Sequence, residues 1–263
     1  MKVSRLQDAY STLAAYMGKT EKNEEVVMQL VEDKAGTLLS QGDPSPIYPS
    51  PDSWSALHSA PTNNVAEHLS RVQALFIYQF IRLFDGDIRH RAQAEGLDAT
   101  LQDWKTQMWE AAKFQALLRD ALGEERFSMA HHDRAYEPVP QTWRDWILAE
   151  SVRRTWIIVS YSQSVYITMR DGQGGCPGSI SYTLRRGPWD SSTSAEWYQL
   201  ITNEDPLFMR SDPPNMLFAR ASPREVSEFG LSIVSIMWDS RKIESWFAKS
   251  PDTHLQVLLQ NDP

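Results

Sequence analysis

Two carboxylates stand close together in Asp85-Gly86-Asp87 and are the first pair in the sequence that offers metal or acid–base chemistry. Arg82, Arg89 and Arg91 are near enough along the chain to neutralise both of them. An ion pair of this kind is more often part of a framework than a catalytic site. We therefore interpret this segment as structural.

A second candidate is His131-His132-Asp133, which is the one cluster among the six histidines. Adjacent side chains point away from each other on a regular element, so both histidines would rarely bind one metal. An exposed loop and a His–Asp acid–base pair are the two interpretations. Cys176 has no evident histidine partner, which favours a plain loop thiol over a nucleophile.

Two further groups favour structural roles. Glu150 stands three and four residues before Arg153 and Arg154, the spacing of ion pairs on one helix face. The glycine-rich stretch 171–175 follows a predicted helix and has no lysine, whereas a phosphate loop precedes a helix and usually contains one. No residue set indicates a metal site or a cofactor.

The composition limits the classes of function. The chain has 263 residues, 41% of them hydrophobic, with a formal net charge of -8. Because affinity for nucleic acids depends on Lys and Arg, this charge argues against direct nucleic-acid binding. One cysteine excludes a disulfide within the chain and fits a reducing compartment, so we expect a cytoplasmic or nuclear protein. No segment reaches about 18 consecutive apolar residues, and the first residues lack a signal-peptide core, so we expect no membrane association.

Apolar spacing predicts an all-α fold. In the clearest case, Leu69, Val72, Phe76, Phe80 and Leu83 form one stripe. We predict helices over 5–17, 22–40, 64–93, 101–121, 143–170, 193–202 and 223–247, with a short one after Ser250-Pro251.

Start signals support several of these helices. They are Thr100 with Asp103, Thr142 with Asp145, and Ser222-Pro223-Arg224-Glu225. The proline-rich stretch 41–63 and the glycine-rich stretch 171–191 read as loops, the second with a short extended piece at 180–184. We expect residues 1–263 to form one irregular multi-helix domain.

Several stretches resemble the effector region of fungal zinc-cluster transcription regulators, and they follow one another in the family's order. They are Leu6–Thr12, Arg71–Glu95 (RVQALFIYQFIRLFDGDIRHRAQAE), Trp143–Trp156, Arg170–Asp190, Asp205–Arg210 and Glu225–Gly230. The resemblance implies an all-α effector domain. Its relatives carry an upstream six-cysteine zinc cluster, which a chain with Cys176 alone cannot build.

Two functions from different classes follow. A helical domain without its DNA reader can hold a hydrophobic metabolite and act as a cofactor-independent cyclase or isomerase of fungal secondary metabolism, for example in a pericyclic ring closure, where orientation supplies the catalysis. Alternatively, the chain is a regulator or co-regulator that acts through protein contacts, with a second copy or a regulator protein as partner. The candidate ligand-binding residues, which packing in the core would also explain, are Tyr78, Arg82, Trp156, Tyr161, Tyr166 and Trp189.

Overall fold

The computed structural model describes residues 5–42, 47, 63–129, 139–210 and 215–249. Among these residues the fold is mostly helical, with one two-stranded sheet, which confirms the predicted all-α class. The chain divides into two compact units: residues 1–134 with 155–177 form unit 1, and residues 135–154 with 178–263 form unit 2. The expectation of one domain over 1–263 stays a prediction.

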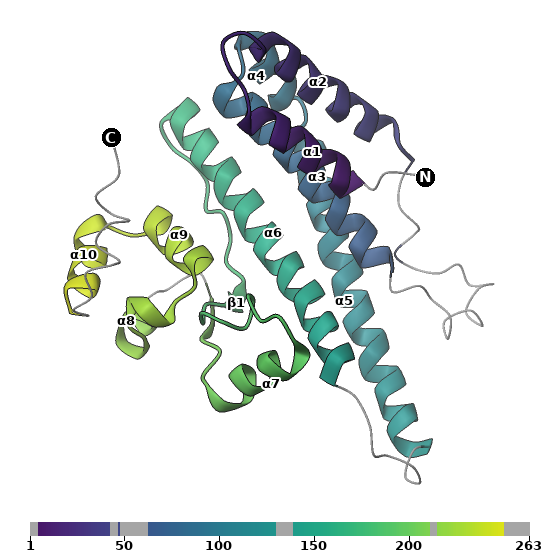
Figure 1. The fold of residues 1–263 in the computed structure, drawn as a ribbon, viewed down its shortest axis with the longest axis vertical. Helices are drawn as coiled ribbons and strands as arrows, with labels where there is room; N and C mark the ends of the chain where they lie inside the picture. The colour runs from purple at the N-terminus through teal and green to yellow at the C-terminus, as the bar shows by residue number, and fades with distance from the viewer. Residues whose placement is uncertain (1–4, 43–46, 48–62, 130–138, 211–214, 250–263) are drawn as a thin grey trace. The chain divides into compact units, whose positions relative to one another are not determined.

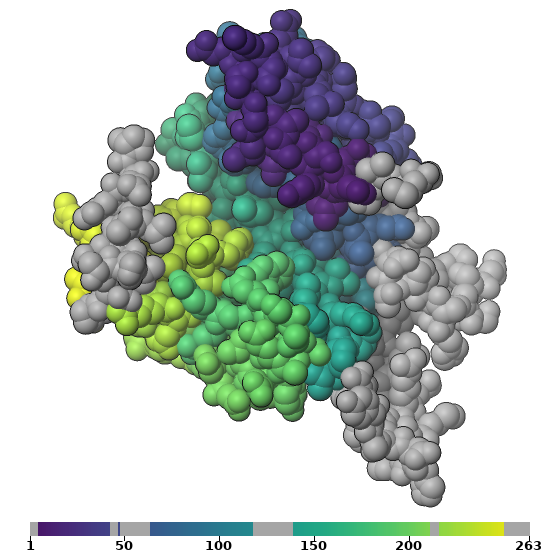
Figure 2. Space-filling view, in the orientation of Figure 1, coloured from purple at the N-terminus to yellow at the C-terminus, as the bar shows by residue number. Residues whose placement is uncertain are grey.

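Unit 1 is built around the long helix α3 (Asn63–Asp85) (Figure 1). Packed against it are α1 (Arg5–Met17), α2 (Glu24–Ser40), α4 (Ile88–Glu95) and α5 (Asp98–Met129). The C-terminal half of α6 (Val139–Asp171) completes the unit. In the space-filling view, the purple side chains of α1 and α2 form a continuous surface (Figure 2).

The core of unit 1 includes part of the stripe that the sequence predicts on α3, because Leu69, Val72 and Leu83 are buried. Leu75 of α3, which lies outside the stripe, is fully buried as well, as are Val31 of α2 and Leu101 of α5. Each such aliphatic side chain contributes about 1.5–3 kcal/mol to folding when it leaves water. Phe80 departs from the prediction, because it is 42% exposed.

The segment Asp85-Gly86-Asp87 ends α3 and starts α4, so the predicted single helix over 64–93 is wrong at this point. A Cβ on Gly86 would lie 2.3 Å from the carbonyl oxygen of Arg82, which leaves no room for a side chain. Asp87 is the N-cap of α4, and its carboxylate accepts from the backbone N–H of His90 at 2.7 Å. The bend therefore comes from a glycine that permits close approach and an aspartate that restarts the helix.

Unit 2 contains the first half of α6, α7 (Ser194–Asn203), α8 (Asn215–Arg220), α9 (Glu228–Met237) and α10 (Ser240–Ala248). Strand β1 (Ser181–Thr183) pairs antiparallel with β2 (Phe208–Arg210), with Tyr182 opposite Met209. The extended piece expected at 180–184 is thus confirmed as β1. Sequence reasoning did not predict β2 and α8.

A buried ion-pair group ties β1 to α6 within unit 2. Glu150 is 0% exposed and meets Arg153 Nη2 at 2.8 Å and Arg154 Nε at 3.2 Å, as its spacing predicts. The backbone N–H of Thr183 donates to the same carboxylate at 2.9 Å. The Arg154 guanidinium lies 4.2 Å from the ring centre of Trp189 and 4.9 Å from that of Phe229. We conclude that this group is a structural connection.

The region 223–247 is not one helix as predicted. Ser222 and Glu225 do form the capping box that the sequence indicates, but it starts only the 3-10 turn η2 (Pro223–Glu225). Ser227 then caps α9 through the backbone N–H of Gly230, and Asp239 caps α10. The other two start signals are also displaced, because α5 begins at Asp98 and α6 at Val139. The short helix expected after Ser250-Pro251 lies outside the described residues.

Candidate functional site

The six residues predicted to bind a ligand lie in different environments. Five belong to unit 1, and Trp189 belongs to unit 2, where it stacks on Arg154. Tyr78 on α3 is 1% exposed, and its hydroxyl is hydrogen-bonded to Thr12 of α1. Burial, the main cause, raises the pKa of Tyr78. This tyrosine therefore packs α1 onto α3.

Arg82 and Tyr166 lie nearer the end of α3. Arg82 is 3% exposed and donates to the side-chain oxygen of Gln93 on α4, and burial lowers its pKa. The Tyr166 hydroxyl donates to Glu95 Oε1 at 2.6 Å, and its ring meets Phe84 edge-on at 5.7 Å. Burial and the hydrogen bond to Glu95 raise the pKa of Tyr166 to about 12. Both side chains have packing partners of their own.

Trp156 and Tyr161 lie on α6, where Tyr161 is 4% exposed. The Trp156 ring lies 6.2 Å from the ring of Trp109 on α5 and 5.0 Å from Lys105 Nζ. Trp156 therefore contacts a titratable group, Lys105, which the sequence analysis did not identify as a candidate. As a ligand-binding set, the six residues stay a prediction.

Lys105 is a buried amine between α5 and α6. It is 6% exposed, and its Nζ donates to Ser160 Oγ at 2.8 Å, with Ser160 itself 4% exposed. No carboxylate partner is found among the described residues, and burial lowers the pKa of Lys105 to about 8. The sequence does contain a signal for this burial. Lys105 lies between Leu101 and Met108, which are both on the buried face of α5, so helical spacing places the amine on that face.

A half-buried titratable group, Asp98, lies two turns earlier on α5. Asp98 Oδ1 accepts from Gln79 Nε2 at 2.6 Å, and burial raises the pKa of Asp98. Gln102 also donates to Gln163 of α6 at 2.5 Å. The pKa of the acid is raised and that of the amine is lowered, which are the directions that loss of water around the charged form produces. Lys105 and Ser160 are close enough for proton transfer, but both are buried, so their arrangement favours a packing role.

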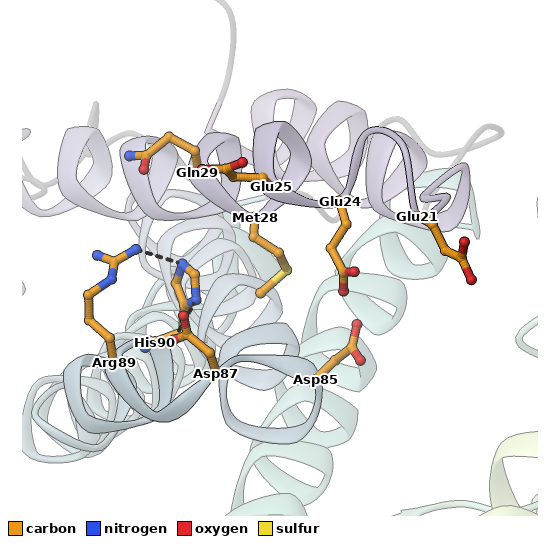
Figure 3. A pocket seen from close by; sticks show the side chains of 9 residues that line it. All are labelled: Glu21, Glu24, Glu25, Met28, Gln29, Asp85, Asp87, Arg89 and His90. Atoms are coloured by element: carbon orange, nitrogen blue, oxygen red, sulfur yellow. Dashed lines mark hydrogen bonds and ion pairs between the residues drawn. The ribbon is translucent and has the colours of Figure 1, made fainter.

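An open pocket of about 550 Å³ lies on unit 1, between α2 and the junction of α3 with α4 (Figure 3). Its lining is mainly acidic and polar, with the thioether of Met28 as the apolar part. The lining residues are Glu21, Glu24, Glu25, Met28, Gln29, Asp85, Asp87, Arg89 and His90. This volume lies in the range typical of ligand sites.

One wall of this pocket is neutralised from within the chain. Lys19 Nζ lies 2.7 Å from both Glu24 Oε1 and Asp85 Oδ2, and Tyr16 donates to Asp85 at 2.9 Å. The hydrogen bond from Lys19 is the main reason that the pKa of Asp85 is lowered. Asp85 is thus neutralised by Lys19, not by the neighbouring arginines that the sequence suggested.

The opposite wall carries a basic group. Arg89 Nη1 donates to both carboxylate oxygens of Glu32, at 2.9 and 2.8 Å. Burial raises the pKa of Glu32, but the hydrogen bonds from Arg89 and Gln93 outweigh it, so the net direction is down. His90 Nδ1 lies 2.9 Å from Asp87 Oδ1. Asp87 therefore lies close to both the backbone N–H and the ring of His90.

The remaining chemical candidates have limited support. Within the described part of the chain, no group of three or more His, Cys, Asp or Glu side chains is arranged to hold a metal ion. Cys176 is exposed, and the 171–175 stretch runs as a loop after α6. His131 and His132 lie outside the described residues. None of the helices in the described part is long and apolar enough to cross a membrane.

Comparison with known proteins gives one informative relative. The chain is 27% identical over 246 residues, 93% of its length, to transcription factor gsfR2 of Penicillium aethiopicum. It spans about half of that protein, 54% of its length. No family model matches the chain, and no solved structure is significantly similar to it. The chain is therefore similar to a fungal transcription factor, and the type of domain remains an inference from the sequence motifs.

Proposed function

We propose that this chain acts in transcriptional regulation and does so through protein–protein contacts. The observation that supports the proposal is the similarity to a fungal transcription factor over 93% of the chain. A similarity of this extent spans residues of both units, whereas a single shared motif would not. The net charge of -8 favours contacts with proteins over contacts with phosphates.

The cyclase or isomerase hypothesis is the less supported alternative. It depended on an aromatic set that would enclose a hydrophobic metabolite. In the structure, Tyr78, Tyr166 and Trp156 each have their own packing partners, as described above. The similarity to a transcription factor also favours the regulatory alternative. We retain the enzyme as an outcome of the experiment.

Deletion of the gene, followed by measurement of transcripts genome-wide, tests the proposal. We expect the loss of the chain to change a defined set of transcripts at least severalfold, and an intact copy to restore them. Purified protein is incubated in parallel with the unsaturated metabolites that accumulate in the deletion strain. Unchanged transcripts together with conversion of such a metabolite by the protein would overturn the regulatory proposal and establish the enzyme.

A further inference from the structure

We infer that the outer edge of strand β2 is a docking site for an extended segment of a partner protein that carries an acidic side chain. This inference rests on the proposed function and names the chemistry of the partner. Strand β2 pairs with β1 along one side, so the groups on its other side decide what it can bind.

The backbone groups of Phe208 and Arg210 point away from β1. In an antiparallel pair, residues that exchange backbone hydrogen bonds alternate with residues whose N–H and C=O groups point outward. In this register Leu184 lies opposite Leu207 and donates to its carbonyl oxygen at 3.2 Å, so Met209 is the next bonded residue of β2. Phe208 and Arg210 flank Met209, and their N–H and C=O groups therefore point to the outer edge.

The outer edge of β1 is closed, whereas that of β2 is open. The backbone N–H of Thr183 donates to Glu150 Oε1 at 2.9 Å, and its carbonyl oxygen accepts from Arg154 at 3.4 Å. In the part of the chain that the structure describes, the outward backbone groups of Phe208 and Arg210 have no such partner. An unpaired strand edge is a template for another strand, which binds through its main chain.

Strand β2 is held in its extended form by contacts within unit 2. Leu207, just before the strand, is buried, and its backbone N–H donates to Asp205 Oδ1 at 2.9 Å. Met209 lies opposite Tyr182, which is buried as well. Because the edge is already extended, a partner strand loses less entropy when it binds than it would against a flexible segment.

The exposed side chains of the edge select an acidic partner. Phe208 and Arg210 point to the same side, because residues two apart in a strand share a face, and Phe208 is 54% exposed. Arg210 donates to Ser179 at 3.4 Å, and no carboxylate pairs with it among the described residues. The guanidinium of Arg153, which is paired with Glu150, lies 5.4 Å from the centre of the Phe208 ring. A carboxylate would therefore compensate Arg210, while an apolar side chain would cover Phe208.

Charge favours such a partner over a second copy of this chain. If two β2 edges paired with each other, both Arg210 side chains would lie on one small surface without a carboxylate to offset their repulsion. In an antiparallel pairing with a partner strand, the residue opposite Arg210 comes two positions before the residue opposite Phe208. We therefore expect the bound segment to have an acidic residue, then any residue, then an apolar residue.

The test uses the full chain and a fluorescein-labelled peptide in which glutamate precedes leucine by two positions among threonines. A matched peptide has glutamine in place of glutamate. Two further peptides carry N-methyl groups either on glutamate and leucine, whose amides would face β2, or on two threonines, whose amides would face away. Binding is measured by fluorescence anisotropy for the wild type, Arg210→Gln and the control Arg241→Gln, an exposed position on α10 that gives the same change in charge.

We expect Arg210→Gln to bind the glutamate peptide about fivefold more weakly than the wild type, and Arg241→Gln to bind it within about twofold, as for the loss of one exposed ion pair. N-methyl groups on glutamate and leucine should weaken binding to the wild type by about tenfold or more, because two main-chain hydrogen bonds are lost. N-methyl groups on the threonines should have a much smaller effect.

Three results would overturn the inference. The first is no measurable binding of the glutamate peptide, or equal weakening by both pairs of N-methyl groups, since neither is compatible with pairing along β2. The second is equal binding of the glutamine peptide, which would remove the acidic partner. The third is a wild-type dimer in sedimentation that the glutamate peptide dissociates, which would assign the edge to a second copy.

The same measurements separate this inference from the proposed function. If the glutamate peptide fails to bind while transcripts still depend on the chain, the docking site is wrong and the regulatory role stands. If deletion leaves transcripts unchanged while the peptide binds with the expected dependence on Arg210 and on N-methylation, the edge is a peptide site in a protein of another function.

Discussion

Lys105 gives the most quantitative prediction, because its burial has a measurable energetic consequence. Burial lowers the pKa of Lys105 from 10.5 to about 8. A shift of this size corresponds to about 3 kcal/mol of lost folding free energy when the amine is charged. In this window the unfolded chain binds the proton more tightly than the folded chain. The contribution of Lys105 to the free energy of unfolding therefore rises with pH between about 8 and 10.5 and is lowest below pH 8.

The perturbation is Lys105→Met, which keeps the length of the side chain and removes the charge. Between pH 7 and pH 9, the wild type should gain about 1.3 kcal/mol in the free energy of unfolding from this lysine, and the variant should gain none of it. The loss of the hydrogen bond to Ser160 changes stability at both pH values alike, at about 1 kcal/mol, so it cancels in the difference. Tyr166, whose pKa is raised to about 12, affects stability mainly above pH 10.

Urea unfolding followed by tryptophan fluorescence at pH 7 and pH 9 measures both free energies. Lys113→Met is the matched control, because Lys113 is exposed and pairs with Glu110. The control should follow the pH dependence of the wild type. Equal pH dependence in the wild type and Lys105→Met would refute the reasoning, since it would mean that Lys105 remains fully solvated or paired in the folded protein.

The other predictions concern stability. Glu150→Ala should lower the free energy of unfolding by about 3–5 kcal/mol in chemical denaturation, because the buried Arg154 and the half-buried Arg153 lose their anion. Tyr166→Phe should lower it by about 1 kcal/mol, through loss of the hydrogen bond to Glu95, and should remove one tyrosine that titrates late in an ultraviolet pH titration. Gly86→Ala should lower the melting temperature by several degrees, because its Cβ would overlap the carbonyl oxygen of Arg82.

For each of these predictions, a specific result would contradict it. A Glu150→Ala protein within about 0.5 kcal/mol of the wild type would place this carboxylate in water. Since burial also raises the pKa of Tyr78, the contradicting result is a Tyr166→Phe protein with as many late-titrating tyrosines as the wild type. An unchanged melting temperature in Gly86→Ala would mean that the turn between α3 and α4 accommodates the added methyl group without a loss of stability.

Local sequence signals predicted the helical class well. The ion pair of Glu150 with Arg153 and Arg154 has its expected place, because it depends on spacing within one helix. The stripe on α3 is buried at Leu69, Val72 and Leu83 but exposed at Phe80. The break at Gly86 was not predicted, because the close contact with the backbone of Arg82 is a property of the folded turn. Likewise, the single helix expected over 223–247 overlooked Ser227 and Asp239 as new caps.

The site was less predictable than the fold. The pocket joins Glu21 and Glu25 to Asp85 and Asp87, which are about sixty residues apart in sequence, and no periodicity relates them. The sequence does show Lys105 as a charged residue on an apolar helix face. Which groups face the amine depends on how α6 packs against α5, and among the described residues they are Ser160 and Trp156 rather than a carboxylate. Residues chosen for being aromatic on central helices proved to have separate packing partners.

The proposed regulatory role is tested most directly by a tethering measurement. The full chain is fused to an unrelated DNA-binding domain and directed to a promoter that drives a reporter gene in a fungal host. We predict that the fusion changes reporter transcription at least severalfold relative to the DNA-binding domain alone. A stably expressed fusion that leaves reporter transcription unchanged would contradict the account.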